Sequence, residues 1–234
     1  MWYFKPYTTV AELKEKAERT AARLKTAEPV LPHPHTRKIC LTWWGEAWCK
    51  NLESYADYDY RLGRGRSYFR ANTVVDLKIR GNVVKAKVQG TSQNPYQITI
   101  TFDSPKTEDI QAITEKLSNR ITDIDDLLKG NFPEDLKELF TQKKPGLFPS
   151  PNEIHFDCTC FDWADMCKHV AAVMYAIGVK IDDNPGFLFE LRGVDMDKFI
   201  KAIIKDKVEE MLKNVDKKSK RIIKNADVSA IFGL

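Results

Sequence analysis

The feature that most constrains the fold is a short stretch, residues 157–169, that holds three of the five cysteines and one of the four histidines. Its potential ligands form two pairs, Cys158 with Cys160 and Cys167 with His169, separated by six residues. A structural zinc site needs four such ligands in a tetrahedron, and three thiolates with one imidazole are a common set. The spacing therefore predicts one structural Zn²⁺ in this stretch.

The same spacing predicts the local backbone. Side chains two positions apart point to one side of a strand but diverge on a regular helix. Cys158 and Cys160 are therefore expected to face the ion from an extended strand. Cys167 and His169 are expected where a turn enters a helix, not in the middle of a helix.

The flanking residues agree with this arrangement. Residues 153–156 alternate polar and apolar side chains, as a strand does. Residues 170–177 are apolar helix formers, and Gly178 is a suitable residue to end that helix. The whole element is predicted to be a strand, a ligand-bearing turn and a helix.

This element resembles the SWIM zinc finger, whose signature is Cys-x-Cys, a variable gap and Cys-x-His on a strand followed by a helix. All four signature positions are matched, by Cys158, Cys160, Cys167 and His169. The resemblance implies a structural zinc ion and a role in binding DNA or protein.

The resemblance extends upstream and covers residues 40–178. In bacterial and archaeal SWIM proteins, a Trp-Trp-Gly helix precedes an arginine- and glycine-rich turn, a small sheet and a Pro-Tyr pair. The matching segments here are Trp43-Trp44-Gly45, Arg61 to Tyr68 and Pro95-Tyr96. Proteins of this kind are often encoded beside Swi/Snf-type helicases, so the resemblance implies such an ATPase as a partner.

Redox chemistry is the alternative for the cysteine cluster, because a Cys-x-Cys pair can act as a dithiol. The nearby third cysteine and histidine argue against it. No secretory signal precedes the cluster, so we expect a cytoplasmic protein in which metal binding is favoured over a disulfide. Cys40 and Cys49 are then expected to be free thiols. No apolar run reaches the length of a membrane span.

Charge is segregated along the chain, although the net charge of +4 is small. Residues 61–87 contain eight basic residues and one acidic residue, whereas residues 107–138 contain nine acidic and four basic residues. Such segregation suits a polyanionic partner on one side of the molecule. The acidic segment is expected to pack against the finger or to contact protein, not DNA.

The basic segment begins with an arginine- and glycine-rich stretch that we expect to form a turn. Glycines let a backbone approach a ligand, arginine forks match phosphate geometry, and neighbouring aromatic rings can stack on bases. The predicted nucleic-acid contacts are Arg61, Arg64, Arg66 and Arg70. The alternative is an exposed basic loop that leads into a sheet.

Hydrophobic periodicity and turn residues predict the other elements. The tryptophan-rich helix is interpreted as core, with base stacking as the alternative. His33 and His35 are expected to be exposed. The expected helices are 9–25 (capped by Thr8 or Thr9, with Glu12 three residues after Thr9 as in a capping box), 43–53, 109–117, 124–128, 134–140 and 195–214. The expected strands are 74–79, 83–88 and 96–102, the first two joined by a hairpin turn at 80–82. Residues 217–224 are expected to form a basic, solvated tail.

These elements predict an α+β fold: a small antiparallel sheet packed with helices, followed by a strand-turn-helix zinc finger and a helical C-terminal region. The sheet is expected to pack on the tryptophan helix. The expected division is 1–105 (N-terminal helix, tryptophan helix and sheet), 106–149 (acidic helices), 150–180 (zinc finger) and 181–234 (helical C-terminal region with a basic tail).

The sequence contains no Gly-rich phosphate loop, no Gly-x-Ser-x-Gly and no convincing carboxylate pair. Four protein ligands would also leave zinc without the open position that catalysis needs. We therefore expect a non-enzymatic, zinc-binding protein that binds nucleic acid, DNA rather than RNA, together with a Swi/Snf-type helicase. The alternative is a protein-interaction adaptor whose zinc finger is purely structural.

Overall fold

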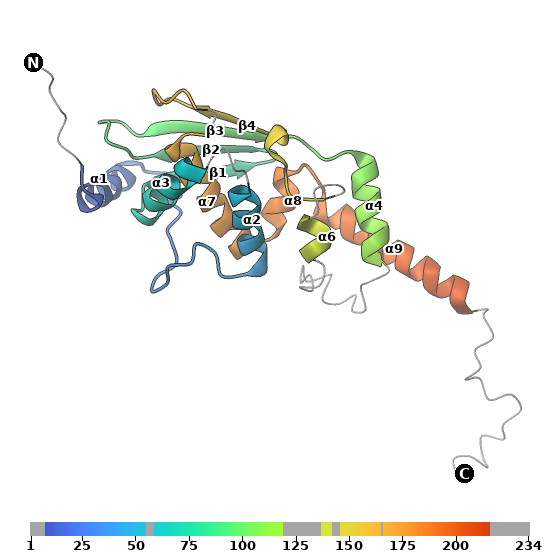
Figure 1. Cartoon of the computed structure of the whole chain (residues 1–234). Coiled ribbons are helices and arrows are strands. Elements are labelled where there is room, and N and C mark those ends of the chain that lie inside the picture. Colours follow the sequence, from blue (N-terminus) through green and yellow to red (C-terminus); the bar gives the residue numbers. More distant parts are fainter. Residues whose placement is uncertain (1–7, 55–58, 119–136, 142–145, 165, 216–234) are drawn as a thin grey trace, which may run out of the picture.

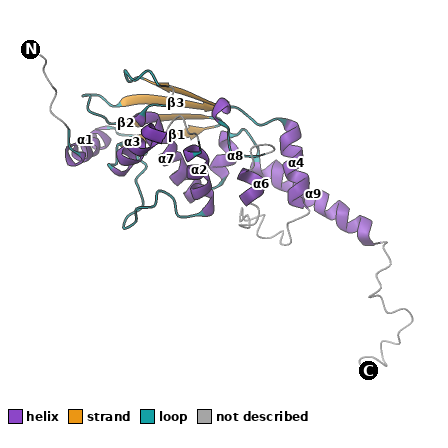
Figure 2. Cartoon of the chain, in the orientation of Figure 1, coloured by secondary structure: helices purple, strands orange, loops and turns teal. Residues whose placement is uncertain are grey.

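The computed structural model describes residues 8–54, 59–118, 137–141, 146–164 and 166–215. They form an α+β fold in which helices cover one face of a four-stranded antiparallel sheet (Figures 1 and 2), as the sequence predicts. The elements are α1 (Val10–Arg23), α2 (Trp43–Glu53), α3 (Asp59–Arg70), β1 (Val74–Arg80), β2 (Val83–Val88), β3 (Tyr96–Phe102), α4 (Thr107–Ser118), α6 (Lys137–Thr141), a 3-10 turn (Pro151–Glu153), β4 (Ile154–Cys158), α7 (Lys168–Asp183), α8 (Gly186–Leu191) and α9 (Met196–Val215).

The sheet follows the chain in the order β1-β2-β3-β4. The predicted three-stranded meander is confirmed as β1, β2 and β3. Gly81, at a φ of 56°, forms the turn between β1 and β2. Glycine adopts that conformation without the steric cost that a Cβ brings. Lys78 pairs with Lys85, so both lie on the same face, with Lys87 two residues further along β2. The fourth strand, β4, belongs to the cysteine-rich stretch and pairs with β3.

The helix α7 lies at the centre of the molecule. Twelve of its sixteen residues are buried, which is typical of a helix surrounded by other elements and not of an amphipathic surface helix. It packs against all four strands, and α2 and α3 also pack on it (Figure 1). Most of the apolar face of the sheet is therefore covered by α7, not by the tryptophan helix as expected.

The tryptophan helix α2 has the predicted bounds and lies in the core. Trp44, Trp48 and Leu52 are buried, as the core interpretation requires. The indole of Trp48 donates a hydrogen bond to the carbonyl of Met174 at 2.8 Å and lies 5.9 Å from the ring of Phe102. These rings are inside the protein, so they do not stack on bases.

Gly178 does not end the finger's helix, because α7 continues for five residues beyond it. A Cβ at Gly178 would lie 3.0 Å from Trp48 and 3.1 Å from the sulfur of Cys40. The glycine is therefore explained by the close packing of α2 on α7, and the predicted helix end was wrong.

Several smaller predictions are confirmed. Thr9 and Glu12 form the capping box that begins α1. The predicted helices at 109–117 and 195–214 correspond to α4 and α9, which pack together, and α6 occupies the end of the predicted helix at 134–140. The predicted helix at 124–128 and the basic tail at 217–224 lie outside the described residues. No helix within the described ranges is both long and apolar enough to cross a membrane.

Candidate metal centre

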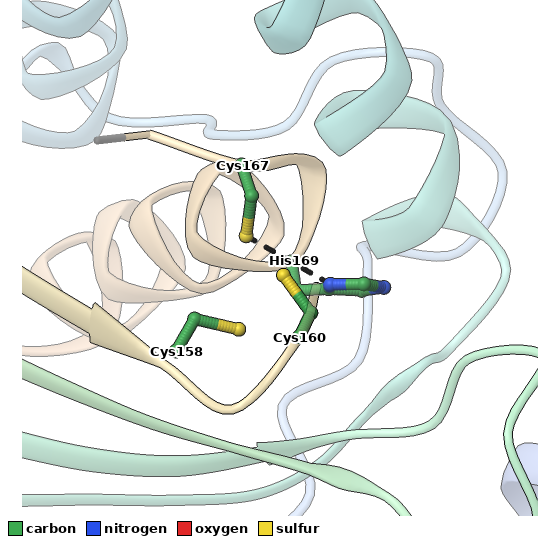
Figure 3. Close-up of side chains that lie close together, drawn as sticks. All are labelled: Cys158, Cys160, Cys167 and His169. Carbon is green, nitrogen blue, oxygen red and sulfur yellow. Dashed lines mark hydrogen bonds between the residues drawn. The ribbon is translucent and has the colours of Figure 1, made fainter. Parts of the chain in front are cut away.

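The structure brings the four predicted zinc ligands together between β4 and α7 (Figure 3). Their ligand atoms, three cysteine sulfurs and one imidazole nitrogen, all lie within 4.8 Å of one another. Cys158 is the last residue of β4, Cys167 is the N-cap of α7, and His169 is the second residue of that helix. Cys167 and His169 thus lie where a turn enters a helix, as predicted. Cys160 lies in a bend two residues beyond the strand end.

Backbone hydrogen bonds fix both sides of the site. Ile98 pairs with Cys158 in the sheet. Immediately after the strand, the amide of Thr159 donates to the carbonyl of Gln97 at 3.1 Å. On the other side, the amide of Val170 donates to the Cys167 sulfur at 3.5 Å, so this thiol caps α7. The ligands are therefore held by a sheet edge and by a helix terminus.

The electrostatics favour a thiolate in the site. A hydrogen bond from the Cys158 side chain lowers the pKa of Cys167 to about 4. Burial opposes this shift, whereas the His169 ring and the Val170 amide add to it. The same contact with Cys167, together with burial, raises the pKa of the Cys158 thiol. The Cys158 thiol therefore keeps its proton and donates it in a hydrogen bond that stabilises the Cys167 thiolate. A bound cation would remove this competition, because metal ligation requires deprotonated thiols.

The arrangement fits a tetrahedral zinc ion. Zinc–sulfur bonds of about 2.3 Å place tetrahedral sulfurs about 3.8 Å apart, so these ligand atoms need to close up only slightly. The Cys167 sulfur and His169 Nδ1 are 3.8 Å apart, a little more than the roughly 3.5 Å that zinc–sulfur and zinc–nitrogen bonds of these lengths require. His169 is 4% exposed, and its other nitrogen, Nε2, is buried and has no hydrogen-bond partner among the described residues. With Nδ1 directed at the sulfurs, the ring is oriented for ligation (Figure 3).

Three residues that sequence reasoning did not assign to the site shape the pocket of this imidazole. The ring of Tyr96 lies 4.2 Å from the His169 ring, and the ring of Tyr68 meets it edge-on at 5.4 Å. A Cβ at Gly90 would lie 2.6 Å from Tyr96 and 3.2 Å from Nε2, so a larger residue would displace the ring. Tyr68 and Tyr96 both belong to segments of the resemblance, which was the sequence signal that pointed to this pocket.

The arginine- and glycine-rich stretch is a helix, not the expected turn or exposed loop. It forms α3, and successive residues of a helix are rotated by about 100°. Arg61 and Arg64 therefore lie on one side of α3, while Arg66 and Arg70 lie on nearly the opposite side. The four predicted phosphate contacts do not form one cluster.

Three of these four arginines have partners within the protein. Arg61 forms an ion pair with Asp162 of the ligand loop. Arg66 pairs with Glu53 of α2 and also contacts the Tyr175 hydroxyl. Arg70 donates to the carbonyl of residue 37. Arg64 is exposed, and its guanidinium lies 5.8 Å from the centre of the Tyr60 ring.

The two glycines of this stretch have different surroundings. A Cβ at Gly65 would lie 2.3 Å from the Cβ of Ala171, so this glycine lets α3 approach α7 closely. Gly63, two residues earlier, faces open space.

The remaining candidate side chains lie outside the ligand cluster. Cys40 and Cys49 are free and buried, with sulfurs 3.6 Å apart. His33 is half-buried and lies 3.2 Å from the Asp182 carboxylate, so the expectation that it is exposed was wrong. His35 is exposed, as predicted.

The chain is similar to Rv2102, an uncharacterized protein of Mycobacterium tuberculosis, with 34% identity over 156 residues. The match covers 66% of this chain and 56% of that protein, so the chain spans little more than half the length of its relative. No family model matches the chain. No solved structure matches it either.

Proposed function

We propose that this protein is a non-enzymatic, SWIM-type zinc protein that binds nucleic acid, DNA in preference to RNA. The observation that carries the proposal is the convergence of three cysteine sulfurs and one histidine nitrogen within 4.8 Å. Such a soft, nitrogen-containing donor set is typical of zinc. We place the protein in the cytoplasm, where thiols stay reduced.

The role of the zinc would be structural. Cys158, Cys160, Cys167 and His169 would complete a tetrahedron and leave no open position for a substrate or a catalytic water. The ion would supply a cross-link between the end of β4 and the start of α7. Since α7 forms the centre of the core, this cross-link supports the position of the helices around it.

Basic side chains beside the metal centre support nucleic-acid binding. Arg64 is exposed on α3. Lys168, which lies between the ligands Cys167 and His169 in sequence, has its ammonium group 4.9 Å from the ring of Tyr68, also on α3. Arg61 is anchored to the ligand loop by Asp162. Guanidinium and ammonium groups in such positions can neutralise phosphates without reading bases.

Salt-dependent binding tests this function. The zinc-loaded protein should bind labelled DNA with an affinity that falls linearly with salt on a logarithmic scale. The protein unfolded by ligand substitution should lose this binding. An affinity that does not respond to salt would exclude phosphate contacts as its source.

A protein-interaction adaptor is the second candidate, because three of the four predicted phosphate-binding arginines already have partners in the protein. In that case the finger would be purely structural, and a Swi/Snf-type helicase is the partner that the resemblance implies. A stable complex between the two purified proteins, formed without nucleic acid and insensitive to nuclease, would favour the adaptor.

A further inference from the structure

Two aromatic side chains on the ligand loop project fully into solvent. Phe161 and Trp163 are 94% and 101% exposed, although both belong to residue types that usually bury most of their surface. The loop that carries them begins after Cys160 and ends at Cys167, so a metal ion would fix both ends. Large rings displayed in this way gain contact area only when a partner covers them.

A second aromatic and basic surface lies beside this loop. Asp162, between the two exposed rings, forms an ion pair with Arg61 of α3. The residue before this arginine, Tyr60, is 73% exposed, and the Arg64 guanidinium lies over its ring. The ion pair therefore brings the ligand loop to the first turn of α3.

The surface continues into a groove of about 750 Å³ between α1, α3 and the start of α7. Arg64 and Lys168 provide two cations there, while Ser67 and Thr91 provide hydroxyl groups and Tyr68 a further ring. Among the described residues that line this groove, no side chain is a carboxylate. The groove thus combines positive charge with hydroxyl groups and an aromatic wall.

We propose that this surface binds a single-stranded nucleic acid. Bases would stack on Phe161 and Trp163 at the ligand loop, and the sugar-phosphate backbone would pass along Arg64 and Lys168 into the groove. Proteins that bind single strands combine these two features, aromatic stacking platforms and a basic groove. In a duplex the flat faces of the bases are already stacked on one another and are hidden from protruding rings.

This inference rests on the nucleic-acid binding proposed above and names its ligand class. The charge of this surface favours a nucleic acid over an apolar protein partner, because the exposed rings lie beside two cations that phosphates would neutralise. DNA and RNA single strands share this chemistry, so separate probes must distinguish them.

Fluorescence anisotropy with labelled oligothymidylate, oligouridylate and a duplex of equal length tests the proposal on the zinc-loaded full chain. The wild type should bind the single strands more tightly than the duplex. The double variant Phe161→Ala/Trp163→Ala should bind oligothymidylate about tenfold more weakly or worse, because each stacked base contributes measurably to affinity. Trp163→Phe, which keeps a ring, should retain most of the affinity.

Leu212→Ala is the matched control, since Leu212 is 63% exposed on α9, away from the ligand loop, and should leave binding unchanged. Zinc content and melting temperature should be equal in all variants. If the double variant loses zinc, Trp163→Leu decides, because leucine keeps apolar surface but has no ring to stack.

Unchanged oligothymidylate affinity in the ring-deleted variants, or tighter binding of the duplex by the wild type, would overturn this inference while leaving the proposed function intact. The exposed rings would then be assigned to a protein partner. Failure of the wild type to bind any of the three probes would overturn both proposals.

Discussion

Arg64 and Arg66 lie two positions apart in sequence, yet the helix directs them to different surroundings. Arg64 is exposed beside Tyr60, near the ligand loop. Arg66 is turned toward α2 and α7, where it pairs with Glu53 of α2 and contacts the Tyr175 hydroxyl of α7. One residue is therefore available to a ligand, and the other connects α3 to its neighbouring helices.

Exchanging each of these arginines for alanine separates binding from stability. Arg64→Ala should weaken nucleic-acid binding and reduce the slope of log affinity against log salt by about 0.7 for a single strand, one phosphate contact. Its thermal stability should match the wild type. Arg66→Ala should leave the slope unchanged and lower the unfolding free energy by about 1 kcal/mol, the upper end for a partly exposed ion pair.

Binding titrations at several salt concentrations, together with urea unfolding, check both variants. The reverse pattern, with the salt slope reduced only in Arg66→Ala, would contradict the assignment of Arg64 as the ligand contact.

Arg192 is a second residue whose environment has a clear consequence. Arg192 directly follows α8 and is 1% exposed. Its guanidinium donates to the Glu153 carboxylate at 2.8 Å and to the Asp103 carbonyl at 2.5 Å. It therefore links α8 to the end of β3 and the start of β4. Burial alone would raise the pKa of Glu153, but hydrogen bonds from Arg192 and Ser150 outweigh it and lower that pKa.

Removing this buried cation should destabilise the protein. Arg192→Leu should cost about 1–3 kcal/mol, because the partly exposed Glu153 carboxylate and the Asp103 carbonyl both lose their hydrogen bond from Arg192. Lys198→Ala, a break in an exposed ion pair, should change stability by less than about 0.5 kcal/mol. Denaturant unfolding measures both, and equal losses would show that Arg192 is not a structural link.

The same pair predicts a pH dependence. Because the pKa of Glu153 is lower in the folded state, its contribution to stability is present above the unfolded pKa of about 4.3 and is lost as the pH falls through the lowered folded value. Wild-type stability should therefore decrease on acidification in this range. Arg192→Leu should show a smaller decrease, measured by denaturant unfolding at a series of pH values.

At the scale of elements, the close approach of α3 to α7 determines where the arginines point. Gly65 permits that approach, since a Cβ there would lie 2.3 Å from Ala171. The new Cβ would also meet the backbone of α7 at Ala171 and Ala172, so the two helices could not relieve the contact by moving a side chain.

Two alanine variants in one helix test this packing. Gly65→Ala should destabilise the protein by about 1–3 kcal/mol, as overpacking of a core contact does. Gly63→Ala, with nothing within 4 Å of the new Cβ, should be neutral or stabilise α3 by up to about 1 kcal/mol, because alanine loses less entropy in a helix. Thermal unfolding compares the two, and equal effects would refute the packing role of Gly65.

Elements with a local cause were predictable from sequence. The capping box at Thr9, the turn at Gly81 and the spacing of the four metal ligands all depend on neighbouring residues. The helix α3 was not predictable in this way, because its glycines and basic residues have no apolar period and its stability comes from packing on α7. Gly178 was misread for the same reason: the cause of the glycine, Trp48, lies far away in sequence.

The exposure of Phe161 and Trp163 was also not predictable from the sequence. Sequence gives residue type but not solvent contact, and the two rings lie in a gap of the signature that carries no periodicity. Only the folded loop between the ligands shows that both are uncovered. The proposed stacking role of these two rings therefore had no sequence prediction to support it, in contrast to the role of Arg64.

At the scale of the whole molecule, the expected zinc finger does not stand apart from the sheet. Its strand, β4, pairs with β3, and its helix, α7, packs on all four strands and on α2 and α3. A metal ion held by these four ligands would thus cross-link two elements of one shared core. We therefore expect loss of the metal to affect the sheet as well as residues 150–180.

Hydrogen exchange on Cys160→Ser tests this cooperativity. Protection should fall together in β1–β4 and α7, since an incomplete site removes the binding energy that stabilises the folded state. Trp163→Phe, which changes the same loop but keeps all four ligands, should show wild-type protection. Loss confined to residues 150–180 would instead support an independent finger.

The metal content of the folded protein tests the central claim most directly. Protein prepared under reducing conditions should contain about one zinc per chain, with three sulfur ligands at about 2.3 Å and one nitrogen ligand at about 2.0 Å by X-ray absorption. Cys160→Ser should bind zinc weakly and show two sulfur ligands. Folded wild-type protein that contains no zinc, and takes up none when it is supplied, would contradict the account.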